Sequence, residues 1–260
     1  MDAAEVLAVF DRQLRRDHRA DGPGDVVERV GDVVRLLGSG GAGWCGVVWS
    51  DLSEETADAA IAEQVQFFTE LGREFEWKVY GHDEPADLAE RLAKAGFAAE
   101  PAEALMVAEI AGLPTEPVLP EGVRIVDVRD AEGVELMVRA QDEGFGRSAP
   151  RQKEHFLRLV AEDPDSLIAL VVMAGDRPVC ASRLEIHQGT EFGSLWGGAT
   201  VPDWRRKGIY KATVAYRARI AAARGCRYLQ VDASDDSRPI LERLGFSRLG
   251  TTTPYVYQPR

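Results

Sequence analysis

A segment rich in proline and glycine separates this chain into two halves, each large enough for a small domain. Residues 112–122 read Gly-Leu-Pro-Thr-Glu-Pro-Val-Leu-Pro-Glu-Gly. Proline cannot donate the backbone hydrogen bond that helices and central strands require, and glycine is costly to order in either. The segment therefore predicts a linker, with one domain over residues 1–115 and a second over residues 122–260.

Strand-like and helix-like patterns alternate in both halves. In the first half they predict helices near 3–14, after Ser53 and at 86–95, with strands near 30–37, 44–49, 76–80 and 104–110. In the second half they predict helices at 131–142, 151–161, 209–224 and 238–244, with strands at 124–128, 167–174, 179–187, 193–201, 228–232 and 251–257. This order predicts layered domains of the α/β (α+β) class.

The charge and the distribution of apolar residues exclude several classes of function. The net charge is -12 and the acidic excess lies in residues 1–120, whereas duplex binding depends on neutralising phosphates. The longest apolar run, Leu167–Ala174, is too short to cross a bilayer as a helix. Asp2 and Glu5 stand where a secretion signal would carry positive charge. We expect a soluble, cytoplasmic protein that binds neither nucleic acid nor a membrane.

The cysteines and histidines show no pattern of metal binding. Cys45, Cys180 and Cys226 are odd in number and widely spaced, which fits neither a disulfide framework nor a zinc site. No two of the four histidines stand at the spacing of metal ligands. We therefore expect no metal, and we interpret the cysteines as small buried residues.

The glycines of residues 38–43, Gly-Ser-Gly-Gly-Ala-Gly, match the spacing of a dinucleotide-binding fingerprint. That fingerprint works only where a helix follows and points its first amides at a pyrophosphate. Here Trp44-Cys-Gly-Val-Val-Trp49 follows, which predicts a strand. We interpret these glycines as a loop between paired strands.

The segment that points to chemistry is Leu195-Trp-Gly-Gly-Ala-Thr-Val-Pro-Asp-Trp-Arg-Arg-Lys-Gly-Ile-Tyr-Lys211. It predicts a strand, then a loop with three consecutive cations, then Gly208 at the start of a long helix. Amides at a helix start attract an anion, and glycine lets the backbone approach a ligand closely. A pyrophosphate would suit this loop, and a basic surface turn is the alternative.

This segment resembles the GCN5-related N-acetyltransferase (GNAT) family, whose pyrophosphate loop reads Arg/Gln-x-x-Gly-x-Gly/Ala after a strand. Arg205 and Gly208 match that loop, whereas Tyr210 stands at its small final position. A second block, Val231–Phe246, is similar to the family's strand, polar turn and helix that ends in Gly-Phe. The resemblance covers about residues 122–260.

The resemblance implies an N-acetyltransferase with acetyl-CoA as the acyl donor. In such proteins the pantetheine arm would pair with the strand ending at Val201, in a splay between that strand and Gln230–Asp232. The acyl thioester would then lie near Trp196–Ala199. The resemblance implies cofactor contacts at Ala199, Thr200, Val201, Arg205, Arg206, Lys207, Gly208, Ile209, Tyr210, Asp232 and Ser237. We expect the substrate to contact Trp196 and Arg183.

The first half resembles a degenerate copy of the same fold. Leu88–Phe97 is similar to Ile240–Phe246, and the strand-like run Phe75–Tyr80 precedes it. No Arg-x-x-Gly-x-Gly/Ala loop stands between the strand-like run 44–49 and the helix predicted after Ser53. The resemblance therefore implies a tandem arrangement of two lobes, each a mixed, mostly antiparallel sheet flanked by helices. Only the second lobe would bind acyl-CoA.

The candidate general base lies on the strand predicted at 179–187. Residues two apart share a face of a strand, so Arg183, Glu185 and His187 lie on one face. If residues 188–191 form a hairpin turn, Glu185 lies nearly opposite Ser194–Leu195, beside the expected thioester. We expect Glu185 to be the catalytic base, because a base must accept the proton of the attacking amine. A solvated sheet face is the alternative.

The general acid that many relatives supply as a tyrosine is missing here, because Leu241 stands at the matching position. Tyr210 and Tyr255 are candidate replacements. We expect transfer of an acetyl group to a primary amine of a small-molecule or peptide acceptor. A non-catalytic acyl-CoA-binding sensor or scaffold is the alternative. The acceptor, the acyl-chain preference and the oligomeric state stay open.

Overall fold

The computed structural model describes residues 2–20, 22, 24–40, 43–162, 165 and 167–259. The chain divides into two compact units. The first comprises Met1–Met106, Asp232–Pro239 and Ser247–Arg260, and the second comprises Val107–Val231 and Ile240–Phe246. Because the chain returns to the first unit after residue 231, no single cut in the linker gives this division. The domain bounds 1–115 and 122–260 stay a prediction.

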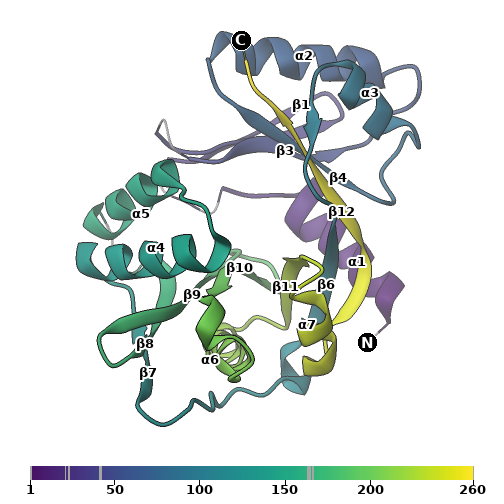
Figure 1. Cartoon of the computed structure of the whole chain (residues 1–260). Helices are drawn as coiled ribbons and strands as arrows, with labels where there is room; N and C mark the ends of the chain where they lie inside the picture. Colours follow the sequence, from purple (N-terminus) through teal and green to yellow (C-terminus); the bar gives the residue numbers. More distant parts are fainter. Residues whose placement is uncertain are drawn as a thin grey trace. The chain divides into compact units, whose positions relative to one another are not determined.

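The first unit contains strands in the order β1-β2-β3-β4-β12 (Figure 1). Neighbouring strands are antiparallel, except that β3 and β4 are parallel. The strands are β1 (Val26–Val30), β2 (Val33–Leu37), β3 (Cys45–Ser50), β4 (Phe75–Tyr80), β5 (Ala98–Ala99, paired with β12) and β12 (Ser247–Tyr257), and β6 (Glu103–Glu109) begins here. The helices are α1 (Ala3–Phe10), the π-helix η1 (Asp11–Arg16), α2 (Ala57–Glu70) and α3 (Leu88–Lys94).

Aromatic side chains fill the core of the first unit. Phe75 and Trp77 lie two residues apart on β4 and therefore share its buried face. Phe68 of α2 stacks on Phe75 with ring centroids 4.1 Å apart, and Phe97 meets Phe75 edge to face. Large rings bury much apolar surface, so this cluster fixes β4 against the helices.

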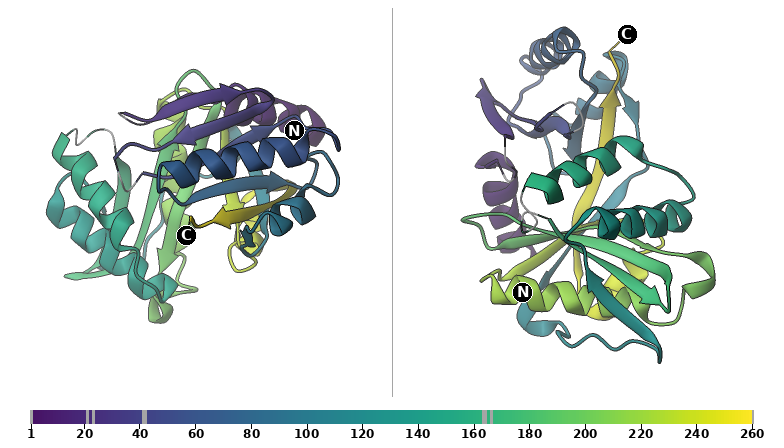
Figure 2. Two further views of the ribbon diagram at one scale, coloured as in Figure 1. Left: turned by 90° about the horizontal axis from the view of Figure 1, so that it is seen from above. Right: turned by 90° about the vertical axis from the view of Figure 1, so that its left-hand side faces the viewer.

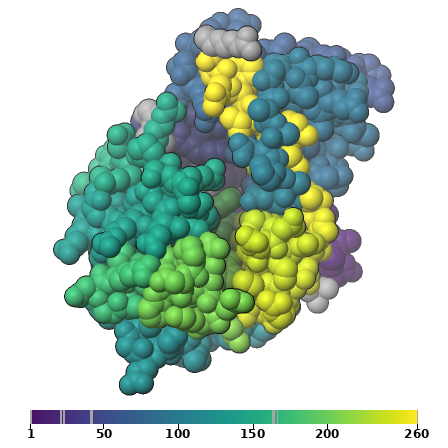
Figure 3. Space-filling model, viewed as in Figure 1, coloured from purple at the N-terminus to yellow at the C-terminus, as the bar shows by residue number. Residues whose placement is uncertain are grey.

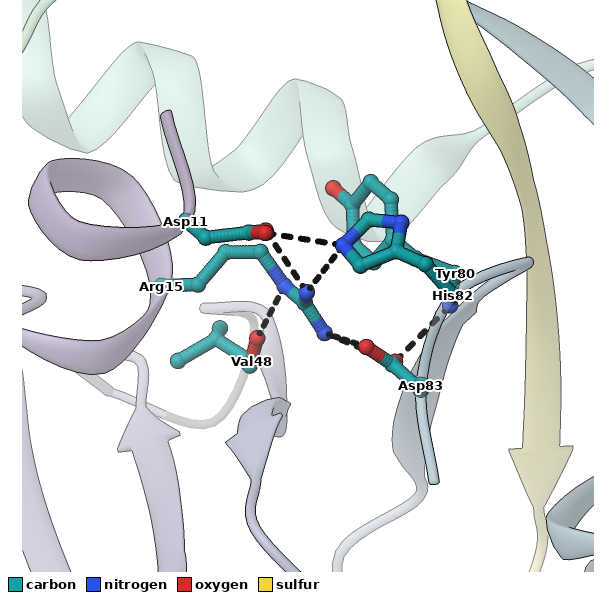
Figure 4. Close-up of polar contacts among 6 residues, drawn as sticks. All are labelled: Asp11, Arg15, Val48, Tyr80, His82 and Asp83. Atoms are coloured by element: carbon teal, nitrogen blue, oxygen red, sulfur yellow. Dashed lines mark hydrogen bonds and ion pairs between the residues drawn. The ribbon is translucent and has the colours of Figure 1, made fainter. Parts of the chain in front are cut away.

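A buried arginine joins η1 to β3 and to the loop after β4 (Figure 4). Arg15 is 2% exposed, and its guanidinium donates to the carboxylates of Asp83 at 2.7 Å and Asp11 at 2.8 Å. Its Nε donates to the carbonyl of Val48 at 3.2 Å, and the ring of Tyr80 lies 4.0 Å from the guanidinium carbon. The large cost of desolvating this cation is thus offset by paired carboxylates and hydrogen bonds.

The second unit contains strands in the order β11-β10-β9-β8-β7. Its strands are β7 (Val123–Asp127), β8 (Ile168–Ala174), β9 (Arg177–Ile186), β10 (Phe192–Thr200) and β11 (Tyr228–Ala233). Only β10 and β11 are parallel among these neighbours. The helices are the short η2 (Ile110–Gly112) and η3 (Pro202–Trp204), α4 (Ala131–Phe145), α5 (Pro150–Glu162), α6 (Ile209–Ala223) and α7 (Arg238–Leu244).

Helices cover both faces of the second unit's sheet, with α4 and α5 on one face and α6 on the other (Figures 1 and 2). Successive residues of β9 serve the two faces, because Ala181 packs with Phe156 of α5 and Cys180 packs with Ile209 of α6. In the space-filling view the teal atoms of α4 and α5 adjoin green atoms of the following segments (Figure 3). Arg183 and Glu185 therefore lie on the face that α4 and α5 cover.

The mixed α/β architecture predicted from the sequence is confirmed, and two local details differ. The run 30–37 is part of a hairpin, because Gly31 turns the chain between β1 and β2 at φ +56°. Ser53 begins a separate turn, and α2 begins four residues later at Ala57. The glycine-rich segment leads directly into β3, although its residues 41–42 lie outside the described residues. No helix in the described ranges is long and apolar enough to cross a membrane.

Replacing Arg15 by methionine should lower the free energy of unfolding by about 3–5 kcal/mol, because Asp83 and Asp11 would keep their charges without their partner. Denaturant titration followed by tryptophan fluorescence measures this change. Arg16→Met is the matched control, because Arg16 is half exposed and pairs with the exposed Asp17. Its loss should change the free energy by less than about 1 kcal/mol. Equal effects of the two substitutions would contradict the role given to Arg15.

Candidate functional site

The hairpin of β9 and β10 sets the register of the candidate site. Glu185 lies opposite Ser194, and Arg183 lies opposite Trp196. Directly opposite residues of antiparallel strands share a face, so these four side chains lie together. The predicted turn at 188–191 is tight, with the amide of Thr190 bonded to the carbonyl of His187. Glu185 therefore lies opposite Ser194, as the prediction of a general base at this position requires.

A bulge interrupts β10 between Trp196 and Ala199. Gly197 has φ +59°, which favours glycine, and its carbonyl accepts a hydrogen bond of 3.0 Å from Nε2 of Gln141 in α4. A Cβ on Gly197 would lie 2.5 Å from that nitrogen, and one on Gly198 would lie 2.9 Å from the ring of Tyr210. A side chain at Gly197 would therefore displace Gln141, and one at Gly198 would displace the ring of Tyr210. The bulge turns the strand at the expected thioester position.

The parallel ladder between β10 and β11 is short. Its pairs run from Phe192 with Tyr228 to Ser194 with Gln230. Strand β10 itself continues to Thr200 alongside β9. From Leu195 onward, the edge of β10 that faces β11 therefore continues beyond the ladder. This matches the expected separation of the two strands.

The loop between β10 and α6 carries two residues with a left-handed backbone. Arg206 has φ +62°, although it is not glycine, and Gly208 has φ +82° at the N-cap of α6. No side chain caps this helix start, and nothing lies within 4 Å of a Cβ built on Gly208. The surroundings of Gly208 are therefore open at the start of α6, beside a strained, basic loop, an arrangement suited to an anion.

The cations of the loop differ in what they contact. The guanidinium of Arg205 donates to the carbonyls of Thr200 at 3.1 Å and Gly144 at 2.8 Å, and so ties the loop to β10 and α4. The ammonium of Lys207 lies 4.2 Å from the ring centroid of Trp204. A guanidinium has five N–H donors, and these two hydrogen bonds leave the others available for a ligand. The contact of Arg205 with a phosphate stays a prediction.

The neighbouring predicted cofactor residues contribute in different ways. The side chains of Ala199, Val201 and Ile209 are buried, which leaves their backbone for contact with a ligand. The ring of Tyr210 lies against Gly198 of the bulge. Burial raises the pKa of the Tyr210 phenol above its ordinary value.

Glu185 is the more exposed member of its face, with 46% of its side chain accessible. Its carboxylate lies 4.0 Å from Nη2 of Arg183, the nearest cation on its strand face. Nε2 of His187 lies 2.7 Å from Oγ of Ser194, the residue opposite Glu185. Glu185 therefore shares its strand face with polar side chains and is accessible to solvent.

Two predicted cofactor residues belong to the first unit. The carboxylate of Asp232 is buried and forms an ion pair with Lys78 of β4, and Ser237 donates to the carbonyl of Ser234. Tyr255 belongs to β12 of the same unit. Leu241, where relatives carry a tyrosine, is fully buried in the second unit.

Two site residues were missed from the sequence. Gln141 lies on the apolar stripe of α4 that includes Val134 and Met137, and it holds the bulge. Arg217 is buried on α6, and its Nη1 donates to the carbonyl of Arg183 at 2.9 Å. A polar residue on an otherwise apolar helix face is the signal that could have identified both.

The sequence comparisons agree with the resemblance seen in the motifs. Residues 128–246 match the model of the family described as Acetyltransferase (GNAT) family. This range contains the β9–β10 hairpin, the basic loop and Leu241. A comparison with curated proteins finds no match.

Solved structures extend the similarity over both halves. A GCN5-related N-acetyltransferase from Kribbella flavida is 18% identical with a TM-score of 0.68, covering 98% of this chain and 95% of that chain. A functionally unknown conserved protein from Staphylococcus epidermidis is 13% identical with a TM-score of 0.67, covering 94% and 97%. A tandem GNAT protein from the clavulanic acid biosynthesis pathway is 11% identical with a TM-score of 0.61, covering 99% and 94%. These likenesses confirm the tandem GNAT fold.

Gly208→Val should weaken acetyl-CoA binding at least about 10-fold, because charge-assisted contacts of about 1.5–3 kcal/mol each depend on close approach to this backbone. Arg205→Ala should weaken it by a similar factor. Isothermal titration calorimetry measures both affinities. Gly225→Val is the matched control, because Gly225 has φ +83° and equally open surroundings at the other end of α6. Unchanged affinity in folded Gly208→Val and Arg205→Ala proteins would rule out this loop as the binding site.

Proposed function

We propose that this chain, in which residues 128–246 form a domain of the GNAT acetyltransferase family, transfers an acetyl group from acetyl-CoA to a primary amine. The observation that carries the proposal is the course of strand β10. Its pairing with β11 ends at Ser194, a bulge follows at Gly197, and the chain then enters the uncapped start of α6 at Gly208. The acceptor would be a small molecule or a peptide, and the enzyme would be cytoplasmic.

The loop and strand supply what acetyl-CoA needs. The amides of Gly208, Ile209 and Tyr210, with the cations Arg206 and Lys207, would hold the diphosphate. The backbone of β10 at Ala199, Thr200 and Val201 would pair with the pantetheine amides. The open space around Gly208 and the edge of β10 beyond Ser194 support this fit. Asp232 and Ser237 stay proposed cofactor contacts through their backbone or hydroxyl groups.

Acetyl-CoA supplies the thioester that the amine attacks. In the proposed reaction the amine nitrogen bonds to the acetyl carbon, and the carbon–sulfur bond breaks. Glu185 accepts the proton that the amine loses, directly or through a water molecule. Tyr210 donates a proton to the departing sulfur, a role supported by its protonated phenol and its position against Gly198. One proton is thus removed and one is supplied. Glu185 lies on β9, and Tyr210 lies in the first turn of α6.

The first unit offers a reason for a single acyl-CoA site. Strands β3 and β4 are parallel like β10 and β11, and their ladder contains only Gly46 with Glu76 and Val47 with Trp77. Just beyond these pairs, Arg15 bonds to the carbonyl of Val48 and to the loop after β4. A side chain of the protein thus uses the backbone group that a pantetheine arm would need. This supports a degenerate first lobe.

A screen of primary amines with acetyl-CoA, read by mass spectrometry, tests the proposed activity. Acetylated product from at least one amine class is expected. The missing tyrosine at Leu241 favours the alternative, an acyl-CoA-binding sensor or scaffold. Binding of acetyl-CoA without acetylation of any amine would support that alternative and overturn the enzyme.

Glu185→Gln should lower kcat by about 10²–10⁴-fold, because the amide keeps the shape of the side chain but cannot accept the proton. Acetyl-CoA affinity should stay nearly unchanged. Steady-state kinetics at neutral pH measure the effect, and higher pH should partly restore the rate as the amine loses its proton in solution. Glu191→Gln, at the turn of the same hairpin, is the control and should retain wild-type kcat. Wild-type turnover in Glu185→Gln would exclude the base role if chemistry limits the rate.

A further inference from the structure

Arg183 is a mostly buried cation with few interactions inside the protein. Only 12% of its side chain is exposed, and its guanidinium carbon lies 4.6 Å from the ring centroid of Phe156. The nearest carboxylate oxygen, on Glu185, is 4.0 Å from Nη2. Within the described part of the chain its side chain makes no hydrogen bond, and its Nε is buried. Burial lowers the pKa of Arg183, and the opposing effect of the nearby Glu185 carboxylate is smaller.

The other buried arginines satisfy their donors within the protein. Arg15 bonds to two carboxylates and a carbonyl, and Arg35 bonds to Glu28 and Gln64. Arg217 donates to the carbonyls of Thr213 and Arg183. Leaving donors of a buried charged group unsatisfied is costly, so a retained exception is most readily explained by a ligand. Arg183 is that exception.

The position of Arg183 assigns this ligand to the candidate active site. Arg183 lies opposite Trp196, and a Cβ on the bulge residue Gly197 would lie 3.6 Å from its Nε. Glu185 follows two residues later on the same face. A buried positive group and an accessible negative group therefore lie side by side, next to the bulge where the proposed function places the thioester.

We infer that Arg183 binds a carboxylate of the acceptor, and that the acceptor is an α-amino acid or another amine that carries a carboxylate close to its nitrogen. The inference rests on the proposed function. Such a molecule presents its amine to Glu185 and its carboxylate to Arg183 at once. A guanidinium suits this task because its planar donors match a carboxylate in a bidentate geometry. An acyl chain ending in a carboxylate would use Arg183 alone and leave the pairing with Glu185 unexplained.

The test compares three sets of probes with acetyl-CoA: L-amino acids, their carboxamides, and the amines that lack the carboxyl group. The wild-type protein should favour the amino acids by about 10- to 100-fold in kcat/KM, the factor typical of a charge-assisted hydrogen bond. In Arg183→Gln this preference should disappear, mainly through KM, while acetyl-CoA affinity is retained. Arg183→Lys should restore part of the preference. Arg124→Gln is the control, because Arg124 is exposed and bonds only to the carbonyl of Gly175.

Thermal stability separates ligand binding from a structural role. Arg183→Met removes a cation that makes no hydrogen bond and fills the space with an apolar chain, so its melting temperature should equal or exceed that of the wild type. A marked fall would show that the fold needs Arg183, and would count against the inference.

The remaining outcomes identify which proposal fails. Acetylation of all three probe sets without preference would overturn the inference and leave the proposed acetyltransferase intact. Faster transfer from succinyl-CoA than from acetyl-CoA, lost in Arg183→Gln, would assign the carboxylate to the acyl donor and overturn the assignment to the acceptor. Binding of acetyl-CoA with no acetylation of any probe amine would overturn both.

Discussion

The hydrogen-bonding requirement of strand β10 organises the second unit. Backbone amides and carbonyls need partners, and β10 pairs with β11 only from Phe192 to Ser194. The bulge at Gly197 then turns the strand, and Gln141 from α4 satisfies one of its carbonyls. Beyond the bulge, β10 leads into the loop whose last residue, Gly208, starts α6. The edge of β10 beyond Ser194, the bulge at Gly197 and the start of α6 at Gly208 therefore follow one another along the chain after β10 separates from β11.

Each unit has a short parallel ladder with an arginine near its end, and the two arginines have different partners. In the first unit the ladder of β3 and β4 is also short, and Arg15 with its carboxylate partners occupies the region where it ends. In the second unit Arg183, beside the bulge, makes no side-chain hydrogen bond among the described residues, and the carboxylate of Glu185 lies 4.0 Å from its Nη2. One arginine is consumed by the fold, and the other remains able to receive a ligand. This contrast supports the proposal that only the second lobe binds acetyl-CoA.

The sequence was most informative where neighbouring residues determine the structure. The spacing of apolar residues predicts the main helices and strands, and the period of two puts Arg183 and Glu185 on one face without any knowledge of the pairing with β10. The glycine of the basic loop was placed at a helix start for the same reason, because its conformation is a local property.

Long-range contacts could not be derived from these patterns. Arg15 reads as one cation in a helix rich in charge, and only the fold brings it to Val48 and Asp83. The contact of Gln141 with Gly197 spans two elements whose packing no local spacing encodes. The carboxylate of Asp232 is paired with Lys78, a partner distant in sequence that no local pattern indicates. Such pairings depend on topology rather than on propensity.

A calorimetric titration of the intact chain with acetyl-CoA decides whether the two lobes differ in the way proposed. Arg15 occupies the end of the β3–β4 ladder in the first unit, whereas the loop at Gly208 is open in the second. We therefore predict one acetyl-CoA bound per chain. Two equivalent sites per chain would contradict the structural role of Arg15, and the absence of binding would contradict the site at β10 and α6.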